Sequence, residues 1–166
     1  MANPTKDFGL LPWKDEAGRF AIETLNKTSG AANYRGDPLS LVAAGTYTKC
    51  TVDTPIDAVC AVAASATDTT IQAWLTSPTQ RWLINSDAAV AITDCGGAFD
   101  INVNSADTTH NISGDNLDVG SIDTTGQMIL MDKHPNDTWG EDDVRCIVTI
   151  HESKFVGTGT AAPVTT

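Results

Sequence analysis

The sequence contains few aromatic residues, few basic residues and no long apolar run. Aromatic side chains make up 6% of the 166 residues, and no apolar stretch approaches the roughly 20 residues that a membrane-spanning helix needs. Ten Lys and Arg residues stand against 21 Asp and Glu residues, which gives a formal net charge of −11. Because nucleic-acid binding depends on neutralising phosphates, this negative charge argues against a nucleic-acid partner. We therefore predict a soluble protein that binds neither nucleic acid nor membrane.

Signatures of catalysis and of metal binding are also missing. The sequence contains no nucleophile elbow, phosphate-binding loop or dinucleotide fingerprint. Its three histidines, His110, His134 and His151, have no Cys, His or Glu neighbour at the spacing of a metal site. Residues 115–118 and 141–143 are rich in carboxylates, but without the EF-hand pattern they are more typical of turns and a solvated acidic face. We predict no enzyme activity, no cofactor and no metal.

The four cysteines show neither metal-binding nor redox spacing. If residues 54–56 form a tight loop, Cys50 and Cys60 would face each other across a hairpin, and a disulfide between them is one alternative. We favour reduced thiols, because residues 1–4 show no basic or apolar region of a secretory signal and the chain is expected to be made in a cytoplasm.

Asp143–Phe155 is the clearest strand in the sequence. Its side chains alternate, so that Val144, Cys146, Val148 and Ile150 share one face. The stretch is rich in β-branched residues, contains neither Gly nor Pro, and is bounded by acidic residues and by a glycine. We predict that it is a central strand with which earlier strands pair.

Shorter strand-like runs precede it, separated by Gly, Pro, Asn and Asp. We expect strands over residues 19–25, 39–44, 46–52, 57–64, 71–75, 80–85, 99–103 and 127–131, with a short helix over 61–64 as an alternative. Polar residues at 104–126 and 132–142 predict two long loops. Strands at intervals of about ten residues are typical of an antiparallel β-sandwich or barrel, and we predict this all-β class.

The two ends differ in composition from the single β domain expected over residues 19–156. Residues 1–18 are punctuated by Gly and Pro and predict an extended N-terminal arm. The apolar residues of this arm, Phe8, Leu10, Leu11 and Trp13, dock either onto the protein's own sheet or onto a neighbouring surface. Residues 157–166 contain mainly Gly, Thr, Ala and Pro, which predicts a flexible tail.

Arg35–Gly36–Asp37 spells an adhesion tripeptide. A tight turn is the favoured interpretation, because Gly36 supplies backbone freedom and Pro38 holds Asp37 in an extended conformation.

Three stretches resemble a family of small virion proteins of tailed phages. The first is Met1–Pro4 with Phe8–Pro12, the second is Tyr34–Pro38 before an apolar strand, and the third is Val144–Phe155, with Ile150–Glu152 near the chain end. In these stretches the chain is similar to head decoration, or cement, proteins, which sit on the outer surface of the capsid. Residues 46–130 depart from that pattern and are richer in Ala, Thr and Asp.

The resemblance implies a non-enzymatic virion protein that binds the phage major capsid protein and stabilises contacts between capsid subunits. It also implies a homo-oligomer, a trimer or else a dimer. Because Phe8, Leu10, Leu11 and Trp13 are apolar and lie in an arm whose Gly and Pro prevent a regular element, we expect them to bind the capsid. An alternative function is a receptor- or carbohydrate-binding module of a head fibre or tail tip. The polar loops at 104–126 and 132–142 favour that alternative, together with an exposed Trp139, since aromatic rings stack on sugars.

Overall fold

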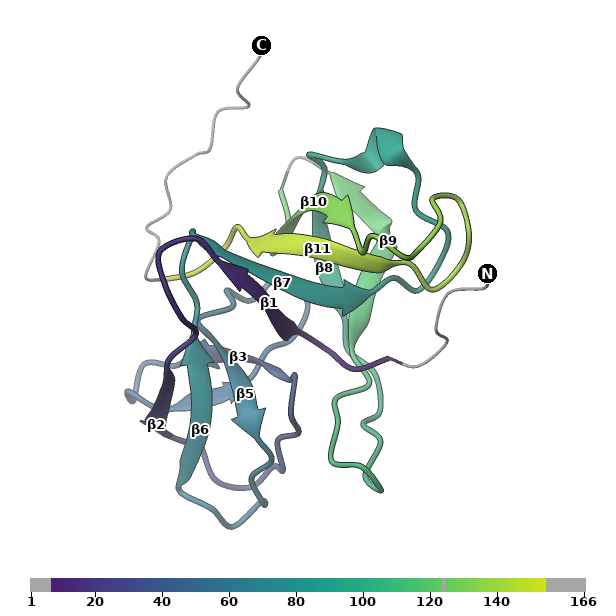
Figure 1. Cartoon of the computed structure of the whole chain (residues 1–166). Helices are drawn as coiled ribbons and strands as arrows, with labels where there is room; N and C mark the ends of the chain where they lie inside the picture. Colours follow the sequence, from purple (N-terminus) through teal and green to yellow (C-terminus); the bar gives the residue numbers. More distant parts are fainter. Residues whose placement is uncertain (1–6, 124, 155–166) are drawn as a thin grey trace.

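Two antiparallel sheets pack together in the computed structural model, which describes residues 7–123 and 125–154 (Figure 1). The six-stranded sheet has the order β1 (Leu11–Asp15), β7 (Gln80–Asn85), β11 (Arg145–Ile150), β10 (Met128–Lys133), β8 (Ala98–Asn102) and β9 (Asn116–Asp123). The five-stranded sheet has the order β2 (Ile22–Asn26), β6 (Thr70–Leu75), β5 (Ala58–Val62), β3 (Pro38–Leu41) and β4 (Tyr47–Lys49). The predicted all-β fold is confirmed, and of the two architectures it is the sandwich.

The predicted central strand is confirmed as β11, which pairs with β7 on one side and β10 on the other. Its alternation determines which side chains enter the core: Cys146 and Val148 are fully buried and Ile150 is nearly so, whereas Arg145 and Thr149 are only half-buried. Because side chains alternate along a strand, a shift of one residue would expose the whole apolar set.

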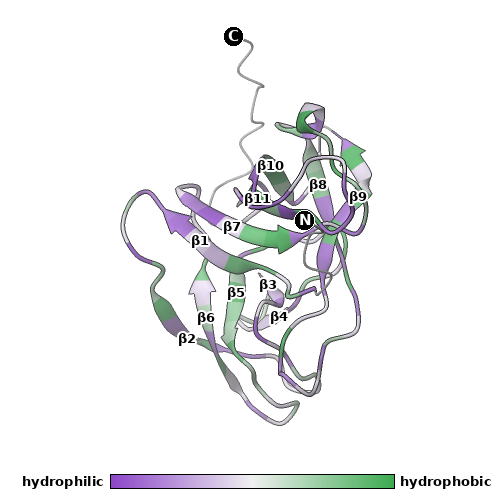
Figure 2. Cartoon of the chain, turned by 45° about the vertical axis from the view of Figure 1, so that its right-hand side comes forward, coloured by the Kyte–Doolittle hydropathy of each residue, from purple (hydrophilic) through white to green (hydrophobic). Residues whose placement is uncertain are grey.

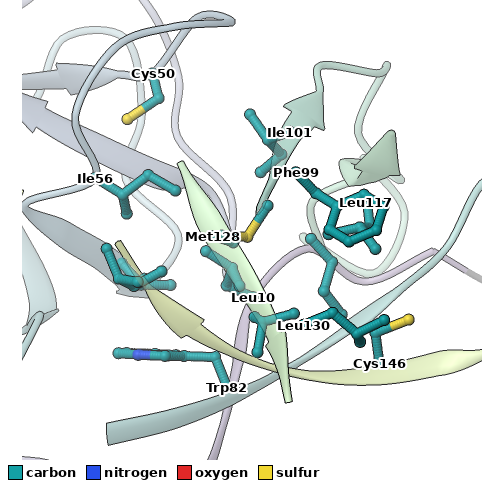
Figure 3. Close-up of a cluster of buried hydrophobic side chains, with 14 of the residues drawn as sticks. Leu10, Cys50, Ile56, Trp82, Phe99, Ile101, Leu117, Met128, Leu130 and Cys146 are labelled. Carbon is teal, nitrogen blue, oxygen red and sulfur yellow. The ribbon is translucent and has the colours of Figure 1, made fainter. Parts of the chain in front are cut away.

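The main core lies between the sheets and draws on both (Figure 3). Trp82 of β7 is fully buried, and its ring meets Phe20 at 4.8 Å and Trp74 of β6 at 6.3 Å, both in edge-on arrangements. Edge-on pairs are a preferred geometry of aromatic rings. Trp74 and Trp82 are therefore core anchors that join one sheet to the other.

A smaller core lies on the opposite face of the five-stranded sheet. In β5, Val59 and Ala61 enter the main core, while Ala58 and Cys60 enter the smaller one. The sheet curls enough for an isolated bridge to join Lys27, directly after β2, to Tyr47 of β4, but it is not closed into a barrel. Small residues in β5 fit because both faces of this strand are covered.

Gln127, which is fully buried, ties a loop beside the five-stranded sheet to the six-stranded sheet. Its side-chain oxygen accepts a hydrogen bond from the Ile101 N–H at 2.8 Å, and its side-chain amide donates to the carbonyls of Thr51 and Thr54. A buried amide with its hydrogen bonds made holds its neighbours in place, because an unmade bond there would be costly.

Of the two docking alternatives for the arm, the structure shows the first for the described residues, which pack onto the protein's own sheet. β1 pairs with β7, and Leu10 is fully buried in the main core. The backbones of Gly9 and Gly36 approach so closely that a Cβ on Gly9 would lie 2.4 Å from the Gly36 carbonyl oxygen. Only glycine fits there, and the approach lets the Leu10 N–H donate to that oxygen at 2.9 Å.

The start of the arm, residues 1–6, and the tail predicted at 157–166 lie outside the described residues.

The long loop predicted at 104–126 is also wrong in part, because β9 occupies residues 116–123. Leu117 is fully buried and Val119 packs against the core, while Asp118 lies between them in sequence. Asn, Asp and Gly in this stretch mask the alternation in the sequence. The helix alternative at 61–64 is wrong as well, since β5 runs to Val62 as a strand.

Cys50 and Cys60 are both free, so the disulfide alternative is wrong. Their side chains belong to different cores, and each thiol lies near a backbone carbonyl: Pro55 at 3.4 Å and Val62 at 3.2 Å respectively. Burial raises the pKa of each of these two thiols to about 12, so both remain protonated at neutral pH.

Candidate functional site

Trp13 is displayed at a bulge in the edge strand β1. Pro12 pairs with Trp82 and Lys14 pairs with Arg81, so Trp13 is the extra residue between them. A bulge in an edge strand re-aims the side chain that it carries. Trp13 is 41% exposed, and it is the most exposed of the four tryptophans.

β7 lies beside β1 and continues the edge of the sheet (Figure 2). The apolar half of β1 lies beside the apolar half of β7, with Leu11 opposite Leu83, and the polar halves pair likewise, with Lys14 opposite Arg81. Leu11 and Leu83 are both half-buried. Trp13 thus stands at the boundary between an apolar and a polar part of the sheet edge.

His134, in the loop after β10, supports the ring of Trp13. The two ring centroids are 5.1 Å apart in an edge-on arrangement. The His134 N–H donates to the Arg145 carbonyl at 2.7 Å, and the Asn136 N–H donates to His134 Nδ1 at 3.2 Å. Burial and the nearby Arg145 lower the pKa of His134, so the imidazole is neutral at neutral pH and carries its proton on Nε2.

An ion pair between Asp137 and Arg145 anchors the same loop. The Asp137 carboxylate is 1% exposed and accepts hydrogen bonds from the Arg145 backbone N–H at 2.8 Å and from Nε at 3.0 Å. A second guanidinium nitrogen, Nη2, also donates to it. Burial opposes ionisation of Asp137, but the hydrogen bonds from Arg145 outweigh it and lower the pKa.

We use the name Trp13 surface for Trp13, His134, Asp137 and Arg145 together. Its aromatic ring is exposed, whereas its polar groups are held by backbone and by one another. A rigid ring of this kind is suited to binding by burial against a partner.

Trp139 does not provide the exposed ring that we expected. It is half-buried against the main core, and Lys133 lies over it with Nζ 5.9 Å from the ring centroid. That distance is within the range of a cation–π contact. Trp13 replaces it as the tryptophan that is open to a ligand.

The four predicted binding residues do not form one surface. Leu10 is fully buried and unavailable to a partner, Phe8 and Leu11 are half-buried, and Trp13 alone is well exposed. Sequence reasoning missed His134, Asp137 and Arg145 as its neighbours. The sequence offered a pair of opposite charges as a signal, Asp137 in the predicted loop at 132–142 and Arg145 near the start of the clearest strand.

The oxygen-rich stretch at 115–118 does not converge on a cation. Asp115 pairs with Lys49, Asn116 contacts Asn104, and Asp118 accepts from the Gly120 N–H. Among residues 7–123 and 125–154, no three His, Cys, Asp or Glu side chains are grouped so that they could hold a metal ion.

The adhesion tripeptide does not present its carboxylate. Asp37 is fully buried, its Oδ2 accepts from the Tyr34 N–H at 2.8 Å, and its own N–H donates to the Tyr34 carbonyl. The favoured interpretation, a tight turn, is confirmed.

Comparisons of the chain with protein-family models, with curated proteins and with solved structures found no match. Within the described part of the chain, no helix is long and apolar enough to cross a membrane.

Proposed function

We propose that this chain is a decoration protein that binds the outer surface of a tailed-phage head and stabilises contacts between major capsid subunits. The observation that carries the proposal is the Trp13 surface, an exposed ring on a sheet edge directly after Phe8–Pro12, which resembles decoration proteins. The protein acts by binding, without catalysis.

Two features of the edge strand suit it to a docking role. Trp13 supplies apolar area that a partner can bury, and large aromatic residues dominate the energetics of many interfaces. β1 pairs on one side only, with β7, so its other edge offers backbone groups to an extended segment of a partner. The Trp13 surface therefore takes the capsid-binding role that we expected of the apolar residues of the N-terminal arm.

A contact of this size is weak by itself, so the proposal includes self-association. In a homotrimer, or a dimer, several Trp13 surfaces would bind neighbouring capsid subunits at high effective concentration. Light scattering of the purified protein should show an oligomer at micromolar concentration. A monomer under these conditions, with the shell absent, would count against this part of the proposal.

Capsid binding is tested on virions from which the protein has been stripped. Adding back the wild-type protein should restore their heat stability, and Trp13→Ala should reduce affinity by about tenfold or more, because a central aromatic anchor is lost. Ile22→Ala is the matched control, since Ile22 is an exposed apolar residue on the edge strand of the other sheet. Unchanged heat stability after stripping, or a Trp13→Ala variant that binds like wild type, would refute the proposal.

The second candidate function is a carbohydrate- or receptor-binding module. It is favoured by the exposed Trp13 ring beside the neutral His134, because an aromatic face next to polar groups can stack on a sugar and hydrogen-bond to its hydroxyls. Binding of the purified protein to host cells or host glycans, with loss of that binding in Trp13→Ala, would support it. A protein that binds stripped capsids but binds no glycan would be a decoration protein and not a carbohydrate-binding module.

A further inference from the structure

Three charged side chains from separate segments meet at Lys49, outside the Trp13 surface. Lys49 is the last residue of β4, and its Nζ lies 3.0 Å from Asp37 Oδ1 and 3.0 Å from Asp115 Oδ1. Asp37 directly precedes β3, and Asp115 directly precedes β9. Both carboxylates are fully buried, whereas the Lys49 side chain is 22% exposed.

Two buried carboxylate oxygens of this cluster lack a hydrogen-bond partner: Asp115 Oδ2, and Asp37 Oδ1, which forms the ion pair with Lys49. Asp115 Oδ1 accepts from Lys49 and, at 2.9 Å, from the Asn104 N–H, but the buried Asp115 Oδ2 has no hydrogen-bond partner. With two carboxylates and one ammonium group, the cluster keeps a net negative charge away from water. A buried ionised oxygen without a partner is costly.

The local electrostatics raise the proton affinity of both Asp115 and Lys49, so the protons stay within the cluster. Burial raises the pKa of Asp115 above its ordinary value in spite of Lys49. For Lys49, burial acts to lower the pKa, but the charges of Asp37 and Asp115 outweigh it and raise the pKa. Moving a proton from the ammonium group to a carboxylate leaves a neutral amine and a neutral acid, which a site sheltered from water tolerates better than separated charges.

We propose that Lys49 and Asp115 form an intramolecular amide bond, with Asp37 carrying the proton between them. The amine and the carboxyl group are already in contact, and holding reactants at near-attack distance removes much of the barrier to such a step. The Asn104 N–H is placed to stabilise the charge that develops on Asp115 Oδ1.

The atoms of this step balance without any added reagent. Lys49 gives a proton to Asp37, and the neutral Nζ attacks Cγ of Asp115, which forms the C–N bond. The C–Oδ2 bond then breaks, and Oδ2 leaves as water with one proton from Nζ and the proton returned by Asp37. The ammonium and carboxylate groups become one amide and one water molecule, and Asp37 ends as it began. Of the two Asp115 oxygens, the one that leaves is Oδ2, which has no hydrogen-bond partner.

The bond would join the two sheets covalently. Lys49 ends a strand of the five-stranded sheet, and Asp115 precedes β9 of the six-stranded sheet, 66 residues further along the chain. Unfolding would then leave a closed loop that cannot fully extend. A protein that must survive outside a cell gains resistance to heat and to proteolysis in this way.

Mass spectrometry of the purified full chain under denaturing conditions tests the proposal, because an ion pair does not survive there. We expect the intact mass to fall below the sequence mass by one water molecule. Trypsin should yield peptide 36–81, uncleaved after Lys49, joined to peptide 82–133. Lys49→Arg should restore the full sequence mass, and Asp37→Asn should restore it or greatly slow the loss.

The wild-type protein alone can overturn the proposal, so the result does not depend on whether a variant folds. A folded wild-type chain with the full sequence mass, cleaved by trypsin after Lys49, would show that the cluster is only an ion pair. A loss of water that maps within peptide 36–81 would assign the bond to another carboxylate and refute Asp115 as the partner. Circular dichroism of Asp37→Asn separates a lost proton carrier from a lost fold.

Discussion

Replacing Leu10 by alanine tests whether the N-terminal stretch is part of the domain or a detachable arm. Leu10 is fully buried, and Figure 3 shows it among core side chains of the six-stranded sheet, near Met128 and Leu130. It directly precedes β1 and is held by the hydrogen bond from its N–H to Gly36. Truncating it should therefore leave a cavity between the sheets.

The size of the effect follows from its burial. Leu→Ala substitutions in cores cost about 2–5 kcal/mol, the larger values where the surroundings cannot collapse. For a domain of this length each kcal/mol lowers the Tm by roughly 2–4 °C, so a cost of about 3 kcal/mol lowers it by about 6–12 °C. Leu11→Ala is the matched control, because Leu11 is the adjacent residue and only half-buried. It should cost about 1 kcal/mol.

Urea unfolding followed by tryptophan fluorescence measures both variants against wild type. Two-state behaviour should be checked by circular dichroism, since the free energy is defined only if the two transitions coincide. A Leu10→Ala midpoint equal to that of wild type would show that this stretch is detached and would refute its place in the core. Deleting residues 1–15 should likewise unfold or strongly destabilise the domain, not leave it intact.

Three further outcomes follow from buried or paired groups. Gln127→Ala should lower the unfolding free energy by about 1–3 kcal/mol, because the Ile101 N–H and the carbonyls of Thr51 and Thr54 lose their hydrogen-bond partner. Arg145 lowers the pKa of Asp137, so their pair stabilises the fold above the ordinary pKa of 3.8 and loses this effect as pH falls through the lowered value. Asp137→Asn should therefore lose stability at neutral pH and show a weaker acid dependence in pH-dependent unfolding. A thiol reagent should label Cys95, the exposed cysteine, in the folded protein, and label the three buried cysteines only on unfolding.

Each of these outcomes has a result that would contradict it. A Gln127→Ala variant as stable as wild type would mean that water replaces the lost hydrogen bonds. Identical acid unfolding of wild type and Asp137→Asn would show that the ion pair adds nothing. Rapid labelling of more than one thiol in the folded protein would contradict the burial of Cys50, Cys60 and Cys146.

Strands with a clean alternation could be predicted from the sequence, because alternation is what a half-buried strand requires. This holds for β11 and for β8, where Phe99 and Ile101 point into the core. β9 could not be predicted in the same way, because Asn, Asp and Gly interrupt its apolar positions and its pairing with β8 depends on a distant partner. β1 was missed because the Gly and Pro residues around it are typical of a linker. Gly9 instead allows a close contact between two backbone segments.

The candidate site could be predicted only as far as Trp13. Its neighbour His134 lies more than a hundred residues away, and only the pairing of β1, β7 and β11 brings the two rings together. The cluster around Lys49 likewise joins segments with no relation in the sequence. The spacing of residues in the sequence identifies groups that lie within one element. These groups come from distant parts of the chain and are brought together by the pairing of strands.

The copy number of the chain on purified virions tests the proposed function most directly. A stained gel or quantitative mass spectrometry of particles compares this chain with the major capsid protein. A decoration protein must occupy sites repeated over the whole shell, so we predict copy numbers of the same order for the two proteins. A few copies per particle, or absence from the particle, would contradict the account.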